Sequence, residues 1–166
     1  MFFRIKKING KEYCYIVENE WKSKGSRQKV KYYLGRVYRF NVKNNSSFFE
    51  YFKIENIQKY IDGNDKNKIL KDLIEWELFR FGISNQEFSM NLKNITIKKN
   101  KKNIVFLIDD GFMCELTLKN LFNFKFEGDE QIDGYRLARN FVEAGIKVPQ
   151  EVFIGLFEML EKNNVV

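Results

Sequence analysis

The sequence predicts an α+β fold: a basic N-terminal sheet of three antiparallel strands, two middle helices, a second antiparallel meander and a C-terminal helical hairpin. Three observations predict it. Two regions, residues 1–43 and residues 88–116, contain runs of apolar or alternating side chains that are typical of strands. The regions between and after them carry helix-capping residues and apolar side chains at helical spacing. The N-terminal region also holds more positive charge than the whole chain has in excess, because the remaining residues are slightly acidic, and this sets it apart from the rest.

The charge is distributed unevenly along the chain. The 166 residues contain 29 lysines and arginines against 22 acidic residues, a net charge of +7. Residues 1–43 hold 12 of those cations against 3 acidic residues, whereas the remainder holds 17 against 19. A basic segment of this kind favours a polyanionic partner such as nucleic acid or an anionic membrane. The alternative interpretation is a lysine-rich surface that only faces water.

The N-terminal region is predicted to form a meander. Asn9-Gly10 separates the β-prone runs Phe2–Ile8 and Lys11–Trp21, and Asn-Gly favours the tight type I′ turn of a hairpin. A third strand is expected over Arg27–Leu34, where side chains alternate in character. The expected cationic side of that strand consists of Arg27, Lys29, Lys31 and Tyr33.

Two helices are predicted in the middle of the chain. Ser47 and Glu50 form a capping box before a helix over Phe48–Ile61. Asp65 is expected to cap a second helix over Lys66–Phe81, which Gly82 ends.

The second half continues with strands and ends with helices. Strands are expected over Phe88–Lys98, Ile104–Ile108 and Phe112–Leu116, with a tight turn at Asp109–Gly111. Three helices should follow: Leu118–Phe124 with Thr117 as its cap, Gly134–Ala144, and Pro149–Lys162 with proline in the first position. The boundary expected from these elements divides the chain into residues 1–43 and residues 44–166, either as two units or within one compact domain.

Several classes of protein do not fit the composition. The chain has no histidine, which excludes Ser-His and Cys-His nucleophile systems and histidine metal ligands. Its two cysteines, Cys14 and Cys114, are too few for a CxxC zinc site or a secreted disulfide scaffold, so we expect buried thiols in a reducing cytoplasm. Charged residues interrupt the N-terminal apolar run at once, and no apolar run is long enough to span a membrane.

The candidate site is the basic, aromatic N-terminal sheet. Strand residues two apart lie about 7 Å from one another, a spacing at which cations can follow a phosphate backbone. The interleaved aromatic residues Tyr13, Tyr15, Trp21 and Tyr33 could stack on unpaired bases, but the sequence favours phosphate contacts without stacking. The expected nucleic-acid-binding residues are Arg4, Lys6, Lys11, Tyr13, Tyr15, Arg27, Lys29, Lys31, Tyr33 and Arg36. We expect no catalytic residue, no metal and no cofactor, and a binding function within a larger ribonucleoprotein or DNA-processing assembly.

Two other functions stay open at this point. The last helix carries an apolar stripe that packs either onto the body or onto a partner subunit, which would make the protein an adaptor or a homodimer. That stripe comprises Val152, Phe153, Leu156, Phe157 and Leu160. The third function is a small Mg²⁺-dependent nuclease using Asp109, Asp110 and Glu115, although Asp-Asp-Gly between apolar strands is more often a hairpin turn.

The N-terminal segment also resembles a known opening. RIKKINGKEYCYIVENEW followed by SRQKVKYYLGRV is similar to the basic segment that precedes the catalytic domain in prokaryotic insertion-sequence transposases of the DDE type, and to stand-alone archaeal proteins of unknown function. The matching residues are Arg4, Lys6, Gly10, Tyr13, Tyr15, Val17, Glu18, Arg27, Gln28, Leu34 and Gly35. The resemblance covers about a fifth of the chain and implies a role in binding DNA. It implies no chemistry, because the remaining roughly 120 residues cannot hold the usual catalytic domain of that family.

Overall fold

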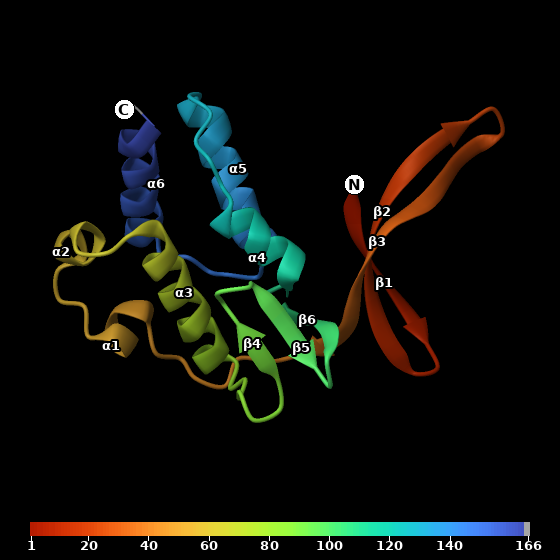
Figure 1. The fold of residues 1–166 in the computed structure, drawn as a ribbon, viewed down its shortest axis with the longest axis horizontal. Coiled ribbons are helices and arrows are strands. Elements are labelled where there is room, and N and C mark those ends of the chain that lie inside the picture. Colours follow the sequence, from red (N-terminus) through yellow and green to blue (C-terminus); the bar gives the residue numbers. More distant parts are fainter. Residues whose placement is uncertain (165–166) are drawn as a thin grey trace.

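The computed structural model describes residues 1–164 and confirms the α+β fold class. Figure 1 shows the helices gathered at one end of the molecule and the N-terminal strands at the other. The strands are β1 (Phe2–Ile8), β2 (Lys11–Lys22), β3 (Gly25–Arg39), β4 (Ser89–Asn91), β5 (Thr96–Lys99), β6 (Lys102–Ile108) and β7 (Gly111–Met113). The helices are α1 (Phe48–Phe52), α2 (Ile57–Asp62), α3 (Lys66–Arg80), α4 (Glu115–Phe122), α5 (Glu130–Glu143) and α6 (Gln150–Asn164).

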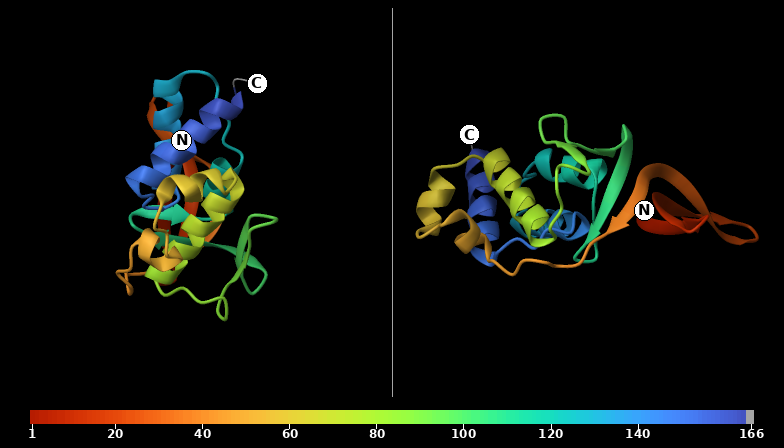
Figure 2. Two further views of the ribbon diagram at one scale, coloured as in Figure 1. Left: turned by 90° about the vertical axis from the view of Figure 1, so that its left-hand side faces the viewer. Right: turned by 90° about the horizontal axis from the view of Figure 1, so that it is seen from below.

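The first three strands form the predicted meander. Asn9 and Gly10 both have positive φ angles, 50° and 76°, as the expected turn requires. Strands β1 and β2 pair along their whole common length, from Phe2 opposite Val17 to Ile8 opposite Lys11. Strand β3 is longer than expected, and its first part forms with β2 a two-stranded hairpin that projects away from the body (Figures 1 and 2).

The pairing of β2 with β3 contains two bulges. Cys14 lies opposite Gly35 and Tyr15 opposite Tyr33, which leaves Leu34 as an extra residue in β3. Ile16 then lies opposite Tyr32 and Val17 opposite Val30, so Lys31 is a second extra residue. Each extra residue shifts the alternation of side chains by one position. Tyr32 and Tyr33, between the two bulges, are therefore out of phase with both ends of β3, which keep the alternation that the sequence suggests.

The last part of β3 joins the meander to the rest of the protein. It pairs in parallel with β6, from Arg36 opposite Ile104 to Arg39 opposite Leu107. Gly35 makes this contact possible, because its φ is +133° and a Cβ there would lie 2.3 Å from the carbonyl oxygen of Asn103. The two sheets expected from the sequence are therefore parts of one seven-stranded sheet with the order β1-β2-β3-β6-β5-β4, and β7 also pairs with β6.

Strand β6 separates two apolar clusters. Ile104, Phe106 and Ile108 point into the main core, which they share with all six helices. Val105 and Leu107 point to the other face, into a smaller cluster around Cys14 and Cys114. In that smaller cluster the rings of Phe3 and Phe112 stack with their centroids 4.7 Å apart. Burial on both faces explains why this strand is an almost continuous apolar run.

The helices differ from the prediction mainly at their boundaries. The Ser47–Glu50 capping box and the Asp65 cap are confirmed, but the single helix expected over residues 48–61 is wrong. It is two helices, because Lys53 adopts a left-handed conformation with φ of 53° and ends α1. Helix α4 begins at Glu115 rather than at Leu118, and Thr117 lies inside its first turn, where its hydroxyl accepts from the amide of Cys114.

The C-terminal helical hairpin is confirmed as α5 and α6. Both helices pack into the main core through Phe141, Val152 and Leu156, each at most 1% exposed. Within residues 1–164, no helix has the length and apolar character needed to cross a bilayer.

Candidate nucleic-acid interface

Two rows of side chains cross the N-terminal meander on one face. Lys6 on β1 lies opposite Tyr13 on β2, which lies opposite Arg36 on β3. In the same way Arg4 lies opposite Tyr15, and Tyr15 opposite Tyr33. Directly opposed residues in a sheet point to the same side, and Tyr13 and Tyr15 are two residues apart, so both rows share a face.

Lys11 belongs to the same face. It lies opposite Ile8, and Ile8 is two residues from Lys6. We call this surface the tyrosine face; it comprises Arg4, Lys6, Lys11, Tyr13, Tyr15, Tyr33 and Arg36.

The three tyrosines form one group. The ring centroid of Tyr33 lies 5.2 Å from that of Tyr15 and 6.4 Å from that of Tyr13. The ammonium group of Lys6 lies over the Tyr15 ring, 5.0 Å from its centroid, a cation–π arrangement. Tyr33 is 57% exposed, whereas Tyr13 and Tyr15 are half-buried. Burial, together with the nearby phenols of Tyr15 and Tyr13, raises the pKa of Tyr33, so its phenol is neutral at physiological pH.

The acidic residues of the meander lie on the opposite face. Glu12, Glu18 and Glu20 alternate with the tyrosine positions along β2, and each is held by a cation of β3. Arg39 lies 2.6 Å from Glu12, Lys31 lies 2.5 Å from Glu18 and Lys29 lies 2.9 Å from Glu20. Hydrogen bonds from Arg39 and Lys29 lower the pKa values of Glu12 and Glu20, so these carboxylates stay ionised. On the opposite face these ion pairs thus flank the buried side chains of Cys14 and Ile16.

This arrangement divides the ten residues expected at the site. Seven of them make up the tyrosine face, whereas Lys29 lies opposite Glu18, and Arg27 opposite Glu20, on the other side. Lys31 is the bulge residue and reaches Glu18 on that same side. The expectation that these three cations share a face with Tyr33 is therefore wrong. The physical reason is the bulge at Lys31, which shifts the alternation between Tyr33 and Lys29.

Three residues that were not expected from the sequence extend the tyrosine face. Tyr38 follows Arg36 by two residues on β3, and the Arg36 guanidinium lies 4.9 Å from its ring centroid. The ammonium group of Lys99, on β5, lies over the same ring at 5.2 Å. Lys102 lies opposite Lys99. It also lies two residues before Ile104, and Ile104 is opposite Arg36, so Lys102 is on the same side of the sheet as Arg36. The lysine-rich run at residues 98–102 was the available signal, but only the β3–β6 pairing brings it to this face.

Trp21, the fourth aromatic residue expected at the site, lies apart from the tyrosines. It is near the end of the projecting hairpin, opposite Ser26, and is 83% exposed.

The carboxylates considered for a metal site do not converge. Asp109 is held by Arg80 at 3.0 Å and by Lys147 at 3.2 Å, while Glu115 pairs with Lys119 and accepts a hydrogen bond from Asn103. Asp109 and Asp110 have φ angles of 44° and 61°, which is the geometry of a two-residue hairpin turn. In the part of the chain that the structure describes, no three acidic or cysteine side chains are grouped to hold a metal ion.

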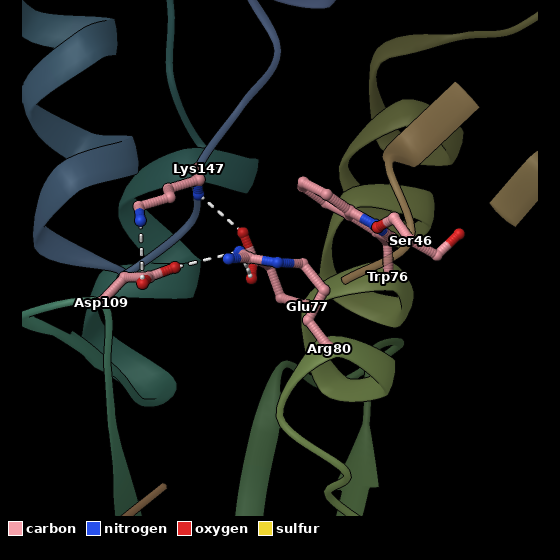
Figure 3. Close-up of polar contacts among 6 residues, drawn as sticks. All are labelled: Ser46, Trp76, Glu77, Arg80, Asp109 and Lys147. Atoms are coloured by element: carbon pink, nitrogen blue, oxygen red, sulfur yellow. Dashed lines mark hydrogen bonds and ion pairs between the residues drawn. The ribbon is translucent and has the colours of Figure 1, made fainter. Parts of the chain in front are cut away.

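The Asp109 pair belongs to a buried polar cluster, shown in Figure 3. Glu77 on α3 is fully buried; it accepts hydrogen bonds from Arg80 at 2.6 Å and from the backbone amide of Lys147 at 2.7 Å. Burial raises the pKa of Glu77 to about 7, although the Lys147 amide and Arg80 both oppose the rise. This cluster ties α3 to the β6–β7 turn and to the segment before α6.

The apolar stripe of α6 lies against the body. Val152 and Leu156 are at most 1% exposed, and Phe153, Phe157 and Leu160 pack against the main core. The rings of Phe153 and Phe157 stack with centroids 6.3 Å apart. Of the two packing partners expected for this stripe, the structure shows the body, which covers Val152 and Leu156 and leaves Phe153, Phe157 and Leu160 half-buried.

Comparisons with models of protein families, with curated protein sequences and with solved structures found no match to this chain.

Proposed function

We propose that the protein binds nucleic acid without catalysis, through the tyrosine face. One observation supports the proposal: the acidic residues of the meander all lie on one face, and the other face carries only basic charged residues. The three acidic residues among residues 1–43 all lie on the opposite face and are paired there, whereas Arg4, Lys6, Lys11 and Arg36 share the tyrosine face with no acidic residue of the meander. Cations without carboxylate partners beside them keep their full attraction for phosphate.

The spacing of these cations also suits a polyphosphate chain. Arg4 and Lys6 are two residues apart on β1, about 7 Å, and neighbouring strands add steps of about 4.8 Å across the sheet. Arginine can hold a phosphate with two parallel hydrogen bonds, and lysine adds a flexible point charge. Lys99 and Lys102 continue the basic surface beyond Arg36 onto β5 and β6.

We assign the tyrosine face a binding role within a larger ribonucleoprotein or DNA-processing assembly. Its side chains are phenols and permanent cations, which contact phosphates and bases but supply no general base at neutral pH. We also propose a cytoplasmic location, which the two free, buried cysteines Cys14 and Cys114 favour because a reducing compartment keeps thiols unpaired.

A salt titration tests the proposal. Binding of a labelled nucleic acid should be measurable at about 50 mM salt and should weaken steeply as salt rises, because each phosphate contact releases a counterion. Reversing two charges on the face, Lys6→Glu with Arg36→Glu, should weaken binding at least about tenfold and reduce the slope of affinity against salt.

The control reverses the same number of charges elsewhere. Lys59→Glu with Lys162→Glu changes two exposed lysines on α2 and α6, far from the meander along the fold. Both double variants have the same net charge, so a difference between them reports the position of the site. Equal losses in the two variants, or binding that does not depend on salt, would contradict the proposal.

A further inference from the structure

We infer that the ligand of the tyrosine face is a single-stranded nucleic acid, one base of which stacks on the ring of Tyr33. The inference rests on the proposed function and specifies the kind of strand that the face accepts. It departs from the sequence alone, which favoured phosphate contacts without stacking.

Tyr33 is the open ring of the tyrosine group. Its 57% exposure leaves much of the side chain accessible, while Tyr15 is covered by the ammonium group of Lys6. Tyr15 and Tyr13 lie at tilts of 50° and 39° to the Tyr33 ring and support it from the β2 side. A phenol held by its neighbours in this way is an ordered platform, and it loses little side-chain entropy when a base is placed on it.

A duplex cannot use such a platform. The faces of its bases are already covered by the base pairs above and below, so stacking on a protein ring requires a base to leave the helix at a cost of a few kcal/mol. An unpaired base has a free face and can stack directly on an aromatic side chain of a sheet, which is how sheets that bind single strands contact their ligands.

The cations of the tyrosine face lie where the phosphate backbone of a single-stranded nucleic acid would pass. Arg4 is in the same cross-strand row as Tyr33, separated from it only by Tyr15. On the other side of Tyr33, Arg36 follows it along β3, and Lys102 lies on the neighbouring strand β6. A nucleotide whose base lies on Tyr33 therefore has cations on both sides for its two neighbouring phosphates.

The chain provides a matched control in the preceding residue. Tyr32 is also 57% exposed, but it lies opposite Ile16 and therefore on the face of the acidic ion pairs. Replacing either tyrosine with leucine removes one exposed aromatic ring and changes no charge. The two variants differ in the face from which the ring is lost and in the contacts of Tyr33 with Tyr13 and Tyr15.

The experiment measures fluorescence anisotropy of three labelled probes at about 50 mM salt: an oligothymidine of about 12 nucleotides, a duplex of equal length, and an abasic strand with the same phosphates. The wild-type protein should bind oligothymidine more tightly than either other probe. Tyr33→Leu should weaken oligothymidine binding about tenfold and leave binding of the abasic strand unchanged. Tyr33→Phe should retain most of the affinity because it keeps the ring, and Tyr32→Leu should bind like the wild type.

The outcomes separate this inference from the proposed function. Three results would each overturn the single-strand inference while the proposed function would stand. They are equal affinity for oligothymidine and the abasic strand, binding of the duplex that is as tight as that of oligothymidine or tighter, and equal effects of the Tyr33→Leu and Tyr32→Leu variants. No binding of any probe by a wild-type protein with a normal circular dichroism spectrum would overturn both.

Discussion

Arg80 on α3 donates a hydrogen bond from Nη1 to Oδ2 of Asp109, 3.0 Å away in the β6–β7 turn. The same nitrogen donates to Oε2 of the buried Glu77 (Figure 3), and the Cζ atom of Arg80 lies 4.9 Å from the centroid of the Trp76 ring. A single guanidinium therefore holds two carboxylates that come from segments 32 positions apart in the chain. Because all three charged groups have little exposure, removal of the arginine takes a buried cation from both carboxylates and leaves them only their contacts with Lys147.

We predict that Arg80→Met lowers the free energy of unfolding by about 3 kcal/mol, the usual cost of breaking a buried ion pair from one side. Urea unfolding followed by circular dichroism measures it. The matched control is Arg139→Met, which removes an exposed arginine paired with Glu143 on α5; its cost should be below about 1 kcal/mol. Equal costs for the two substitutions would contradict a supporting role for the Arg80 cluster.

The second prediction concerns the pH dependence of stability. The pKa of Glu77 is about 7 in the folded protein, against an ordinary value of 4.5. Between these two pH values the folded state keeps a proton that the unfolded state has released, so the contribution of Glu77 to the free energy of unfolding falls as the pH rises. The contribution is fully present below about pH 4.5 and is lost above about pH 7, a total fall of up to about 3 kcal/mol.

Comparison with Glu77→Gln isolates this contribution from those of the other titrating groups. The glutamine does not ionise, so the stability of the wild type relative to the variant should decrease steadily from about pH 5 to about pH 7. Urea unfolding at several pH values measures both proteins. A relative stability that is constant or increases over this interval would show that Glu77 is ionised throughout.

The third prediction concerns the junction between the meander and the body. Gly35→Ala should destabilise the protein by more than about 3 kcal/mol, because it adds both left-handed backbone strain and a methyl group 2.3 Å from the carbonyl oxygen of Asn103. Gly25→Ala is the control for strain alone, since Gly25 has a φ of +117° and no atom lies within 4 Å of the position that an added methyl group would occupy. It should cost about 1 to 2 kcal/mol.

Thermal or urea unfolding compares these two variants. If both glycines cost the same to replace, the close approach of β6 to Gly35 does not contribute to the stability of the sheet. Nucleic-acid binding is a second measurement for Gly35→Ala, because Gly35 is close in sequence to Tyr33 and Arg36, two residues of the tyrosine face.

Much of the local structure followed from short patterns in the sequence. Three local features depend only on contacts within a few residues: the Asn9-Gly10 turn, the Ser47–Glu50 capping box and the Asp65 cap. No distant segment is needed to form them, so the sequence pattern is enough to predict them. The break between α1 and α2 could not be predicted this way. Lys53 adopts a left-handed conformation that its residue type disfavours, and the packing of the surrounding aromatic side chains against α3 supports it.

The candidate site was predicted only in part. Strand alternation and the hairpin register were enough to place Arg4, Lys6, Tyr13 and Tyr15 together, because β1 and β2 pair without interruption. The position of Lys29 relative to Tyr33 depended on the bulge at Lys31, and a bulge depends on how the partner strand twists rather than on the residue itself.

The sequence by itself determined the α+β class, the succession of strand and helix regions and the concentration of positive charge in the first quarter of the chain, because these depend on composition and on contacts between near neighbours. It did not determine every element, since the single strand expected over Phe88–Lys98 is the two strands β4 and β5. Only the tertiary structure decided which side of the sheet each charge occupies and which distant residues meet. The parallel pairing of β3 with β6 brought Lys99 and Lys102 to Arg36, and two extra residues in β3 separated the paired cations from the tyrosines. Strand pairing over long separations is set by the burial of whole faces, which no local pattern contains.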